Sequence, residues 1–432
     1  MSSSGIPGSR SSSRSGPRPT GSHPRPGGRS RAAAVTLATA LLCGTAGVAP
    51  GAAAAAPRAE TPVPLPSAGA SAAPAPKLPV MPPYYDLTQN PCTEGSDRTV
   101  TAVPWAQQKL ELTRAHQLST GAGVTVAVID TGVASGVAAL KGRVSGAGTG
   151  ATEDCVGHGT FVASVIAARP AAGSGFSGVA PDARILAVRA IDSTGAPDPA
   201  RVAQGIRSAV DAGAEVISVS LAFTSASDAL KSALDHAADE DVLVVAAGVP
   251  DGVTDQSPAE ERRPVAFWPA AQPGVLSVVD LDINDARTDG AFEPVRADLA
   301  APGQGITGIG PRGKGNYLAN GASVAAAFTA GAAALVRSYE PELTAGEVAD
   351  RLVAGGYPAQ VPRLNPYGAL SAVLPTDAPP LRAGASDIRL NPVYEDPAPA
   401  RRAYTVLTVS LTAAAVLGGA VLLARRHRRG RA

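Results

Sequence analysis

Short, almost continuously apolar segments alternate with helical patterns between residues 104 and 374, and this alternation is the strongest constraint on the fold. Strands are expected at residues 123–129, 184–191, 215–221, 242–247 and 275–281. Helices are expected at residues 158–168, 199–212, 227–239, 323–339 and 344–353. Apolar strands that alternate with helices form a parallel sheet with both faces covered. The sequence therefore predicts one α/β domain of about 270 residues, with a central, mostly parallel sheet as the middle of three layers.

The residues before this domain have the order of a secretory signal. Residues 1–31 contain arginine but no acidic residue, residues 32–48 are apolar and rich in alanine, and small residues continue to position 56. This order predicts a signal peptide over residues 1–56 with a long basic first part. A disordered basic tail followed by a helix is the alternative. Residues 57–103 are expected to form an exposed proline-rich linker and an N-terminal extension.

The other end of the chain predicts a membrane anchor. Residues 375–402 form a proline-containing stalk, residues 403–424 give about 22 positions without a charge, and residues 425–432 carry five arginines. An uncharged stretch of this length spans the hydrocarbon core as a helix, and the larger positive cluster stays in the cytoplasm. We therefore expect a single-pass protein of the cell membrane, with the α/β domain outside and the C-terminus inside. A buried core helix is the alternative, although such a helix rarely ends in five arginines.

Charge and cysteine content exclude several classes of protein. Lys and Arg number 37 against 36 Asp and Glu, so the net charge of +1 provides no global basic field for nucleic acid. The three cysteines exclude a four-cysteine zinc site. Cys43 would leave with the signal peptide, and Cys92 and Cys155 would remain in an oxidising compartment, where a disulfide is expected. Two free buried thiols are the alternative. We predict no metal site and no cofactor.

Three short segments of the α/β domain carry candidate catalytic groups. The first expected strand runs into Asp130, at the edge of the sheet where α/β proteins place their sites. His158 opens a helix between two glycines, which let backbone and substrate approach the imidazole. Ser323 opens another helix, near backbone N–H groups and the positive end of the helix dipole, where an oxyanion is stabilised.

Each of these residues alone has a plainer explanation. Asp130 can be a turn residue, His158 a loop or capping residue, and Ser323 a helix N-cap. Together, in the order Asp, His, Ser on one α/β domain, they match one known order of the serine-protease triad. His158 would take the proton from Ser323 and give it to the leaving amine. Asp130 would hold the imidazole in one tautomer and stabilise its positive form.

Residues 105–370 resemble the subtilisin family, the subtilases. The matching stretches, in the family's order and with plausible spacing, are VAVIDTGV (126–133), GHGTFVAS (157–164), SGVAPDARILAVR (177–189), VISVSL (216–221), DLAAPG (298–303) and GASVAAAFTAGAAALVRS (321–338). The resemblance implies a subtilisin-like three-layer fold for residues 104–374. It also implies a serine endopeptidase that hydrolyses peptide bonds through an acyl-enzyme, with Asp130, His158 and Ser323 as its triad.

The remaining layout resembles one group of this family, the mycosins. These are membrane-anchored subtilases associated with type VII secretion in actinobacteria. The shared features are a signal peptide, a proline-rich extension with a cysteine, the dipeptide DC before x-GHGT, a C-terminal span and a basic tail. The resemblance implies a peptide or protein substrate and a type VII secretion membrane complex as partner. It also implies a disulfide between Cys92 and Cys155 that fastens the extension beside His158.

Three positions depart from the family's pattern. Ala327 replaces a proline of the serine motif, and the other two departures concern the oxyanion hole. The asparagine whose side-chain amide donates to the oxyanion is replaced by Val249, and the threonine of the serine motif by Ala322. The backbone N–H of Ser323 should remain as a donor. Loss of one donor typically lowers turnover by about 10²–10³, so reduced activity is expected. The amides that could replace the missing donor are those of Asn316, Asn320 and Gln256.

The segment after the fourth expected strand is interpreted as a remodelled surface loop. Residues 249–264 are polar, and their carboxylates are expected to be solvated. These are Asp251, Asp255, Glu260 and Glu261. Ser220 and Leu221 match positions that line the substrate cleft in the family, where a strand edge pairs with an extended peptide. A plain buried strand serine is the alternative for Ser220.

Two functions follow from these observations. The first is a membrane-anchored, extracytoplasmic serine endopeptidase linked to type VII secretion. The alternative is a weakly active or inactive subtilase-fold subunit that stabilises a membrane secretion complex, and the residues at 249 and 322 favour it. A secreted adhesion or binding domain would require the triad match to be accidental.

Overall fold

The computed structural model describes residues 77–82, 87–88, 92–192, 194–258 and 261–373, together with positions 412, 416 and 418–420. The predicted signal peptide at residues 1–56 lies outside these residues, and the predicted membrane span at residues 403–424 lies largely outside them. Among the described residues, no helix is both long and apolar enough to cross a membrane.

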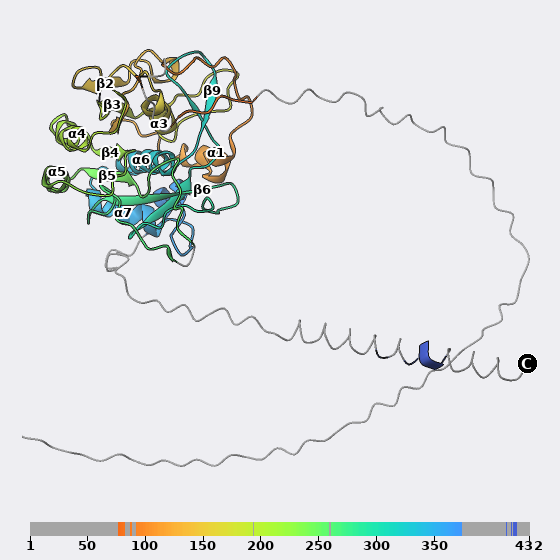
Figure 1. The fold of residues 1–432 in the computed structure, drawn as a ribbon. Coiled ribbons are helices and arrows are strands. Elements are labelled where there is room, and N and C mark those ends of the chain that lie inside the picture. The colour runs from red at the N-terminus through yellow and green to blue at the C-terminus, as the bar shows by residue number, and fades with distance from the viewer. Residues whose placement is uncertain are drawn as a thin grey trace, which may run out of the picture. The chain divides into compact units, whose positions relative to one another are not determined.

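A seven-stranded sheet forms the centre of the domain (Figure 1). Its strands are β1 (Thr125–Asp130), β2 (Val144–Ala147), β3 (Arg184–Arg189), β4 (Val216–Val219), β5 (Leu243–Ala247), β6 (Leu276–Leu281) and β7 (Leu299–Pro302). Their order is β2-β3-β1-β4-β5-β6-β7, and every pair is parallel. The residues of β4, β5 and β6 are all buried, because helices cover both faces of such a sheet. The predicted α/β architecture is confirmed.

The two faces of the sheet pack into separate cores. Val126 and Val128 of β1 belong to one core, and Ala127 and Ile129 belong to the other, because successive side chains of a strand point to opposite faces. Helices α4 (Pro199–Asp211) and α5 (Asp228–Asp239) pack together on the second face. Helices α3 (His158–Ala167) and α6 (Ala322–Tyr339) pack on the first (Figure 1).

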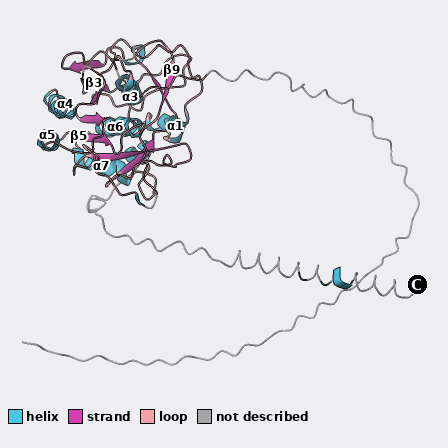
Figure 2. Cartoon of the chain, viewed as in Figure 1, coloured by secondary structure: helices cyan, strands magenta, loops and turns pink. Residues whose placement is uncertain are grey.

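Cyan helices and magenta strands alternate through the domain in Figure 2, as the sequence predicted. The remaining helices are α1 (Trp105–Lys109), α2 (Leu112–Ala115), the 3₁₀ helix Ala138–Leu140, α7 (Ala345–Ala354) and α8 (Pro366–Ser371). Ser227 caps the start of α5, since its hydroxyl accepts the Leu230 N–H at 3.2 Å. Thr344 and Glu347 form a reciprocal capping box at the start of α7. Such caps satisfy backbone donors that a helix start leaves free.

Sequence patterning did not predict β2, β7 or the antiparallel hairpin of β8 (Ile306–Ile309) and β9 (Asn316–Ala319). β2 and β7 are the outermost strands of the sheet. Each has four residues, with the sequences VSGA and LAAP. Their small residues and proline carry little of the β-branched and aromatic signal that marks a strand. Their pairing therefore depends on the neighbouring strand more than on local preference.

The N-terminal extension is fastened to the domain by backbone pairing, by side-chain hydrogen bonds and by a disulfide. The Met81 N–H donates to the Leu318 carbonyl at 2.7 Å, and the Leu318 N–H donates to the Pro79 carbonyl at 2.9 Å. The extension therefore lies beside β9 as a short parallel partner. Further on, Cys92 forms a disulfide with Cys155.

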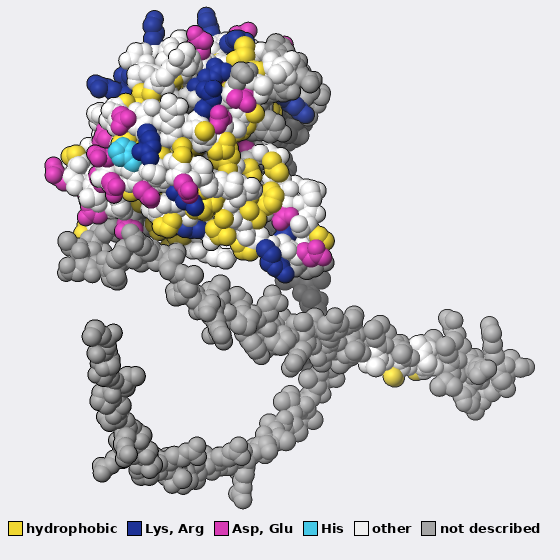
Figure 3. All heavy atoms as spheres, turned by 60° about the vertical axis from the view of Figure 1, so that its left-hand side comes forward, with side chains coloured by type: hydrophobic (Ala, Val, Ile, Leu, Met, Phe, Trp, Pro, Cys, Tyr) yellow, Lys and Arg dark blue, Asp and Glu magenta, His cyan; other side chains and the backbone are white. Residues whose placement is uncertain are grey.

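Side chains of both signs are interspersed on the face of the domain that Figure 3 displays, with apolar side chains between them. This face has no extended basic field of the kind that binds nucleic acid.

Candidate active site

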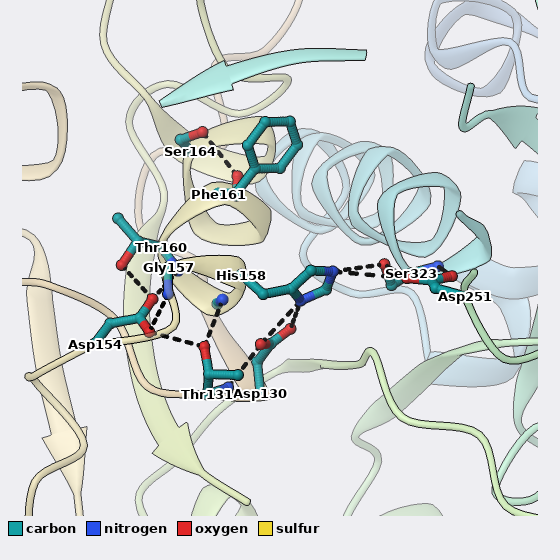
Figure 4. A network of polar contacts seen from close by, with 11 residues as sticks. Asp130, Thr131, Asp154, Gly157, His158, Thr160, Phe161, Ser164, Asp251 and Ser323 are labelled. Carbon is teal, nitrogen blue, oxygen red and sulfur yellow. Dashed lines mark hydrogen bonds and ion pairs between the residues drawn. The ribbon is translucent and has the colours of Figure 1, made fainter. Parts of the chain in front are cut away.

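The carboxyl edge of the sheet brings Asp130, His158 and Ser323 together (Figure 4). Asp130 is the last residue of β1, His158 is the first of α3, and Ser323 is the second of α6. All three residues are buried, with exposed fractions of 0%, 3% and 0%. Three elements that lie far apart in the sequence thus place their chemical groups at one point.

Asp130 and His158 form a buried ion pair. His158 Nδ1 lies 2.8 Å from Oδ2 and 3.0 Å from Oδ1 of Asp130. Burial alone would raise the pKa of Asp130, but the charge and hydrogen bond of His158, the nearby Ser220 hydroxyl and the Thr131 N–H bring it below its ordinary value. An ionised carboxylate at this position keeps the proton on Nδ1 and directs Nε2 toward Ser323.

Gly159 sets the distance between α3 and β1. A Cβ atom at this position would lie 2.1 Å from the Gly132 carbonyl oxygen and 3.1 Å from Oδ1 of Asp130. Only glycine allows the first turn of α3 to approach the end of β1 this closely. The glycine therefore helps to bring His158 within hydrogen-bonding distance of Asp130.

The buried side chain of Asp154 orders the turn before α3. Its Oδ1 accepts hydrogen bonds from the Thr131 hydroxyl at 2.9 Å and the Gly157 N–H at 2.7 Å. Its Oδ2 accepts from the N–H and the hydroxyl of Thr160 at 2.9 Å and 2.6 Å (Figure 4). Burial raises the pKa of Asp154. The sequence marked Asp154 only as part of the dipeptide DC, and not as the residue that ties the end of β1 to the start of α3.

Ser323 lies between an imidazole and a helix N-terminus. Its Oγ is 3.1 Å from Nε2 of His158. Its backbone N–H lies in the first turn of α6, where N–H groups have no partner within the helix. An imidazole can take the proton of this hydroxyl, and the helix N-terminus can hold the negative charge that develops on a carbonyl oxygen.

A fourth group, the carboxylate of Asp251, reaches Ser323. The Ser323 N–H donates to Oδ1 of Asp251 at 3.1 Å, and the Ser323 hydroxyl donates to Oδ2. Oδ2 also lies 3.6 Å from Nε2 of His158 (Figure 4). The prediction that Asp251 is solvated in a surface loop is wrong, since its side chain is only 6% exposed. The loop after β5 turns inward and brings this residue to Ser323.

The residues at the two expected oxyanion-donor positions, 249 and 322, lie in the same apolar cluster. Val249 and Ala322 belong to one small buried cluster with Ala247 and Phe267. Their exposed fractions are 5% and 1%. These side chains fill space but offer no hydrogen bond to an oxyanion.

None of the three amides considered as replacements lies at Ser323. The Asn316 amide nitrogen donates to the Gly308 carbonyl, the Asn320 amide oxygen accepts the Gly305 N–H, and the Gln256 amide nitrogen bonds to Thr254. The polar side chain nearest the Ser323 N–H is instead Asp251. The sequence did not mark Asp251 as a site residue, and the one signal that could have pointed to it is the absence of a side-chain donor two residues earlier, at position 249.

The two carboxylates change the proton affinity of His158. Burial alone would lower the pKa of the imidazole, but the charges and hydrogen bonds of Asp130 and Asp251 raise it to about 10. This raised pKa favours a proton on both ring nitrogens of His158 at neutral pH.

A cavity of about 260 Å³ opens beside Asp251. It is bounded by the loop after β5, by Gly321 and Ala322 at the start of α6, and by Val80 and Met81 of the N-terminal extension. Asp280 of β6 also lines it. The cavity is lined by Asp251 and by the residue before Ser323, so it provides room for part of a substrate or for movement of the Asp251 side chain.

Ser220 and Leu221 lie directly after β4. The Ser220 N–H donates to the Ile129 carbonyl at 3.4 Å, so this buried serine lies next to Asp130. Leu221 is partly buried and packs against the core under α4 and α5. The position of Ser220 is compatible with the alternative of a plain strand serine, and its role in a substrate cleft stays a prediction.

The disulfide lies close to the candidate site. Cys155 is three residues before His158, and the Thr93 N–H donates to the Cys155 carbonyl at 2.9 Å. The bond joins positions 63 residues apart. It therefore fastens the extension to the turn that precedes α3. No group of His, Cys, Asp and Glu side chains within the described part of the chain has the arrangement of a metal site.

Comparison with known proteins places the chain in a family. Residues 121–364 match the model of the subtilase family. Mycosin-1 of Mycobacterium tuberculosis is 35% identical over 75% of this chain and 85% of its own length. Thermitase of Thermoactinomyces vulgaris is 34% identical over 54% of this chain and 82% of its own length.

Solved structures of mycosins are also similar to this chain. The crystal structure of MycP1 from the ESX-1 type VII secretion system is similar with a TM-score of 0.58 and 26% identity, over 67% of this chain and 92% of that one. A chain of the periplasmic assembly from the ESX-5 inner membrane complex has a TM-score of 0.55 and 26% identity, over 72% and 95%.

The chain therefore belongs to the subtilase family of serine peptidases and has a subtilisin-like fold. Within that family it is similar to the mycosins over three quarters of its length.

Proposed function

We propose that this protein is an extracytoplasmic serine endopeptidase that is anchored in the cell membrane and works with a type VII secretion complex. The observation that carries the enzymatic part is the continuous set of contacts from Asp130 through His158 to Ser323. All three residues lie in motifs of the subtilase family, within the matched region.

In the proposed reaction, Ser323 Oγ attacks the carbonyl carbon of the scissile peptide bond while its proton passes to His158 Nε2. His158 then gives this proton to the leaving amine, and the C–N bond breaks to leave an acyl-enzyme. A water molecule, deprotonated by the same imidazole, hydrolyses the acyl-enzyme. Asp130 holds the Nδ1 tautomer and stabilises the imidazolium at each stage.

The proposed location and partner rest on the relatives and on the ends of the chain. The similar MycP1 structure is described as part of the ESX-1 type VII secretion system, and another neighbour belongs to an ESX-5 inner membrane complex. The uncharged residues 403–424 and the arginines at 425–432 fit an anchor with the C-terminus in the cytoplasm. Membrane fractionation of the full chain, compared with a chain that ends at residue 402, tests the anchor. Only the shortened chain is expected to be released from the membrane fraction, and equal release of both chains would contradict the proposed anchor.

Hydrolysis of fluorescence-quenched peptides by the full chain tests the enzymatic proposal. Ser323→Ala and His158→Ala should each lower kcat/KM by about 10⁴ or more. Ser338→Ala is a matched control on the same helix, because Ser338 is partly exposed and its hydroxyl donates to the Ala122 carbonyl. If Ser323→Ala retained the hydrolysis of the unaltered protein, Ser323 would not be the nucleophile.

A second candidate function is a weakly active or inactive subunit that stabilises the secretion complex. It is favoured by the apolar pair Val249 and Ala322 and by the carboxylate at the Ser323 N–H. Secretion in a deletion strain that carries the Ser323→Ala variant separates the two functions. Restored secretion would favour the subunit role, and failed restoration with normal protein level would favour proteolysis.

A further inference from the structure

The Asp251 carboxylate occupies the position where a substrate oxyanion would be held. In a serine peptidase the N–H of the nucleophile is a backbone donor to the oxyanion. Here the Ser323 N–H donates to Oδ1 of Asp251 at 3.1 Å. The contact is close, since a Cβ atom at Gly321 would lie 2.1 Å from Oδ1 of Asp251. One oxygen of the carboxylate thus stands where the oxyanion would form.

An ionised Asp251 opposes catalysis in three ways. It takes the Ser323 N–H, and it repels a second negative oxygen at the same place. It also accepts the hydroxyl hydrogen of Ser323, which is then directed away from His158. Finally, together with Asp130, it keeps the imidazole protonated, so that His158 has no free nitrogen to act as a base.

We propose that Asp251 is the side-chain donor of the oxyanion hole in this protein and that it acts as a neutral carboxylic acid. This inference rests on the proposed peptidase function. A carboxylic acid that is kept neutral can donate a hydrogen bond to an oxyanion. The acid would replace the amide that Val249 cannot supply, and its ionised form would block the hole.

The charges around Asp251 allow one proton to be shared. His158 faces it from α3 at 3.6 Å, with Asp130 of β1 on the other side of the imidazole. Asp280 of β6 lines the adjoining cavity, and no Lys or Arg is found among the described residues around that cavity. His158 is thus the cation that faces Asp251, and the two groups form a coupled pair. The proton resides on His158 Nε2 in the resting form and on Asp251 Oδ2 in the active form.

The active form requires only a short movement. The cavity of about 260 Å³ beside Asp251 gives the side chain room to release the Ser323 N–H. Entry of a peptide carbonyl excludes water, which disfavours the charged pair relative to the neutral pair. The proton then passes from Nε2 to Oδ2, leaving a neutral imidazole and a neutral acid.

The proton balance of the reaction is complete without another reactant. Ser323 Oγ bonds to the carbonyl carbon, its proton moves to His158 Nε2, and the π electron pair of the carbonyl moves onto oxygen. The Ser323 N–H and the Asp251 O–H donate to this oxygen. When the C–N bond breaks, His158 gives its proton to the amine and the carbonyl reforms. Asp251 keeps its proton throughout.

The shared proton determines how kcat/KM depends on pH. Catalysis needs one proton on the pair formed by Asp251 and His158. A second proton at low pH removes the base, and loss of the shared proton at high pH leaves a carboxylate in the hole. kcat/KM should therefore be bell-shaped in pH. In Asp251→Asn the amide donates at every pH, so the loss of activity on the alkaline side should disappear.

Peptide hydrolysis by the full chain and three variants, measured between pH 4 and 11, tests the proposal. Asp251→Asn should be as active as the unaltered protein at its optimum, and more active at higher pH. Asp251→Ala should lower kcat/KM about 10²–10³-fold at that optimum, since a donor is lost. Asp255→Asn is the matched control, because Asp255 lies in the same loop and bonds to the Ser257 N–H. It should leave the profile unchanged. Thermal unfolding of each variant verifies the fold.

Several outcomes would overturn the proposal. If kcat/KM of Asp251→Ala equalled or exceeded that of the unaltered protein at every pH, Asp251 would only block the oxyanion hole and would not donate to the oxyanion. The same alkaline loss in Asp251→Asn would assign that loss to another group. Activity that appears only in Asp251→Asn would show that the acid never donates. If neither the unaltered protein nor Asp251→Asn hydrolyses peptide or reacts with a fluorophosphonate at Ser323, the proposed peptidase function itself fails.

Discussion

Removal of the disulfide between Cys92 and Cys155 should destabilise the domain by a large amount. The bond closes a loop with a sequence separation of 63. In the chain-entropy model a loop of this length loses about 14 cal/mol/K in the unfolded state, which corresponds to about 4 kcal/mol at 25 °C. The folded state loses little else, because Thr93 still donates to the Cys155 carbonyl. The free energy of unfolding should therefore fall by about 4 kcal/mol in the double variant Cys92→Ala, Cys155→Ala.

Urea unfolding followed by tryptophan fluorescence measures this change. Trp105 and Trp268 both lie in the domain and report on its unfolding. The midpoint should shift strongly while the m-value stays comparable. Cys43→Ala serves as the control, and it should change nothing. A loss below about 1 kcal/mol in the double variant would refute the view that this bond holds the extension to the domain.

Three further variants test how the site is assembled. Asp154→Ala leaves several buried donors without an acceptor, so the free energy of unfolding should fall by about 3 kcal/mol or more in urea, and by less in Asp154→Asn. Gly159→Ala should force α3 away from β1 and lower kcat/KM about 10²-fold in peptide hydrolysis, whereas Gly136→Ala, where a Cβ meets nothing within 4 Å, should not. Protonated His158, with its pKa raised from 6.5 to about 10, stabilises the fold fully below pH 6.5, and this stability is lost as the pH rises through 10. Urea unfolding should therefore show the advantage of the unaltered protein over His158→Gln shrinking between pH 6.5 and 10.

The layers of the fold could be predicted from the sequence because they depend on local patterns. The apolar run that ends at Asp130 predicted β1, and the spacing of apolar residues predicted α4 and α5. The sequence also placed His158 and Ser323 at the starts of helices, where the structure has them. The edge strands lacked such a signal, because their short sequences pair only in the context of the sheet.

The position of Asp251 could not be predicted in the same way. Its sequence environment is a polar loop with several carboxylates, which usually indicates a solvated segment. The structure places the start of that loop beside the start of α6, where Val249 and Ala322, 73 positions apart in the sequence, lie in one buried cluster. The role of Asp154 could not be predicted either, because it also depends on tertiary structure. Its hydrogen-bond partners lie close together only when β1 and α3 are packed in the folded domain.

Fluorophosphonate labelling of the folded full chain, with mass spectrometry of its peptides, tests the central claim most directly. A serine that is activated by His158 and Asp130 should form a covalent adduct on the peptide that contains Ser323. The adduct should be absent from Ser323→Ala and present in Ser338→Ala. No adduct at Ser323 in folded protein, or an adduct that persists in Ser323→Ala, would contradict the account.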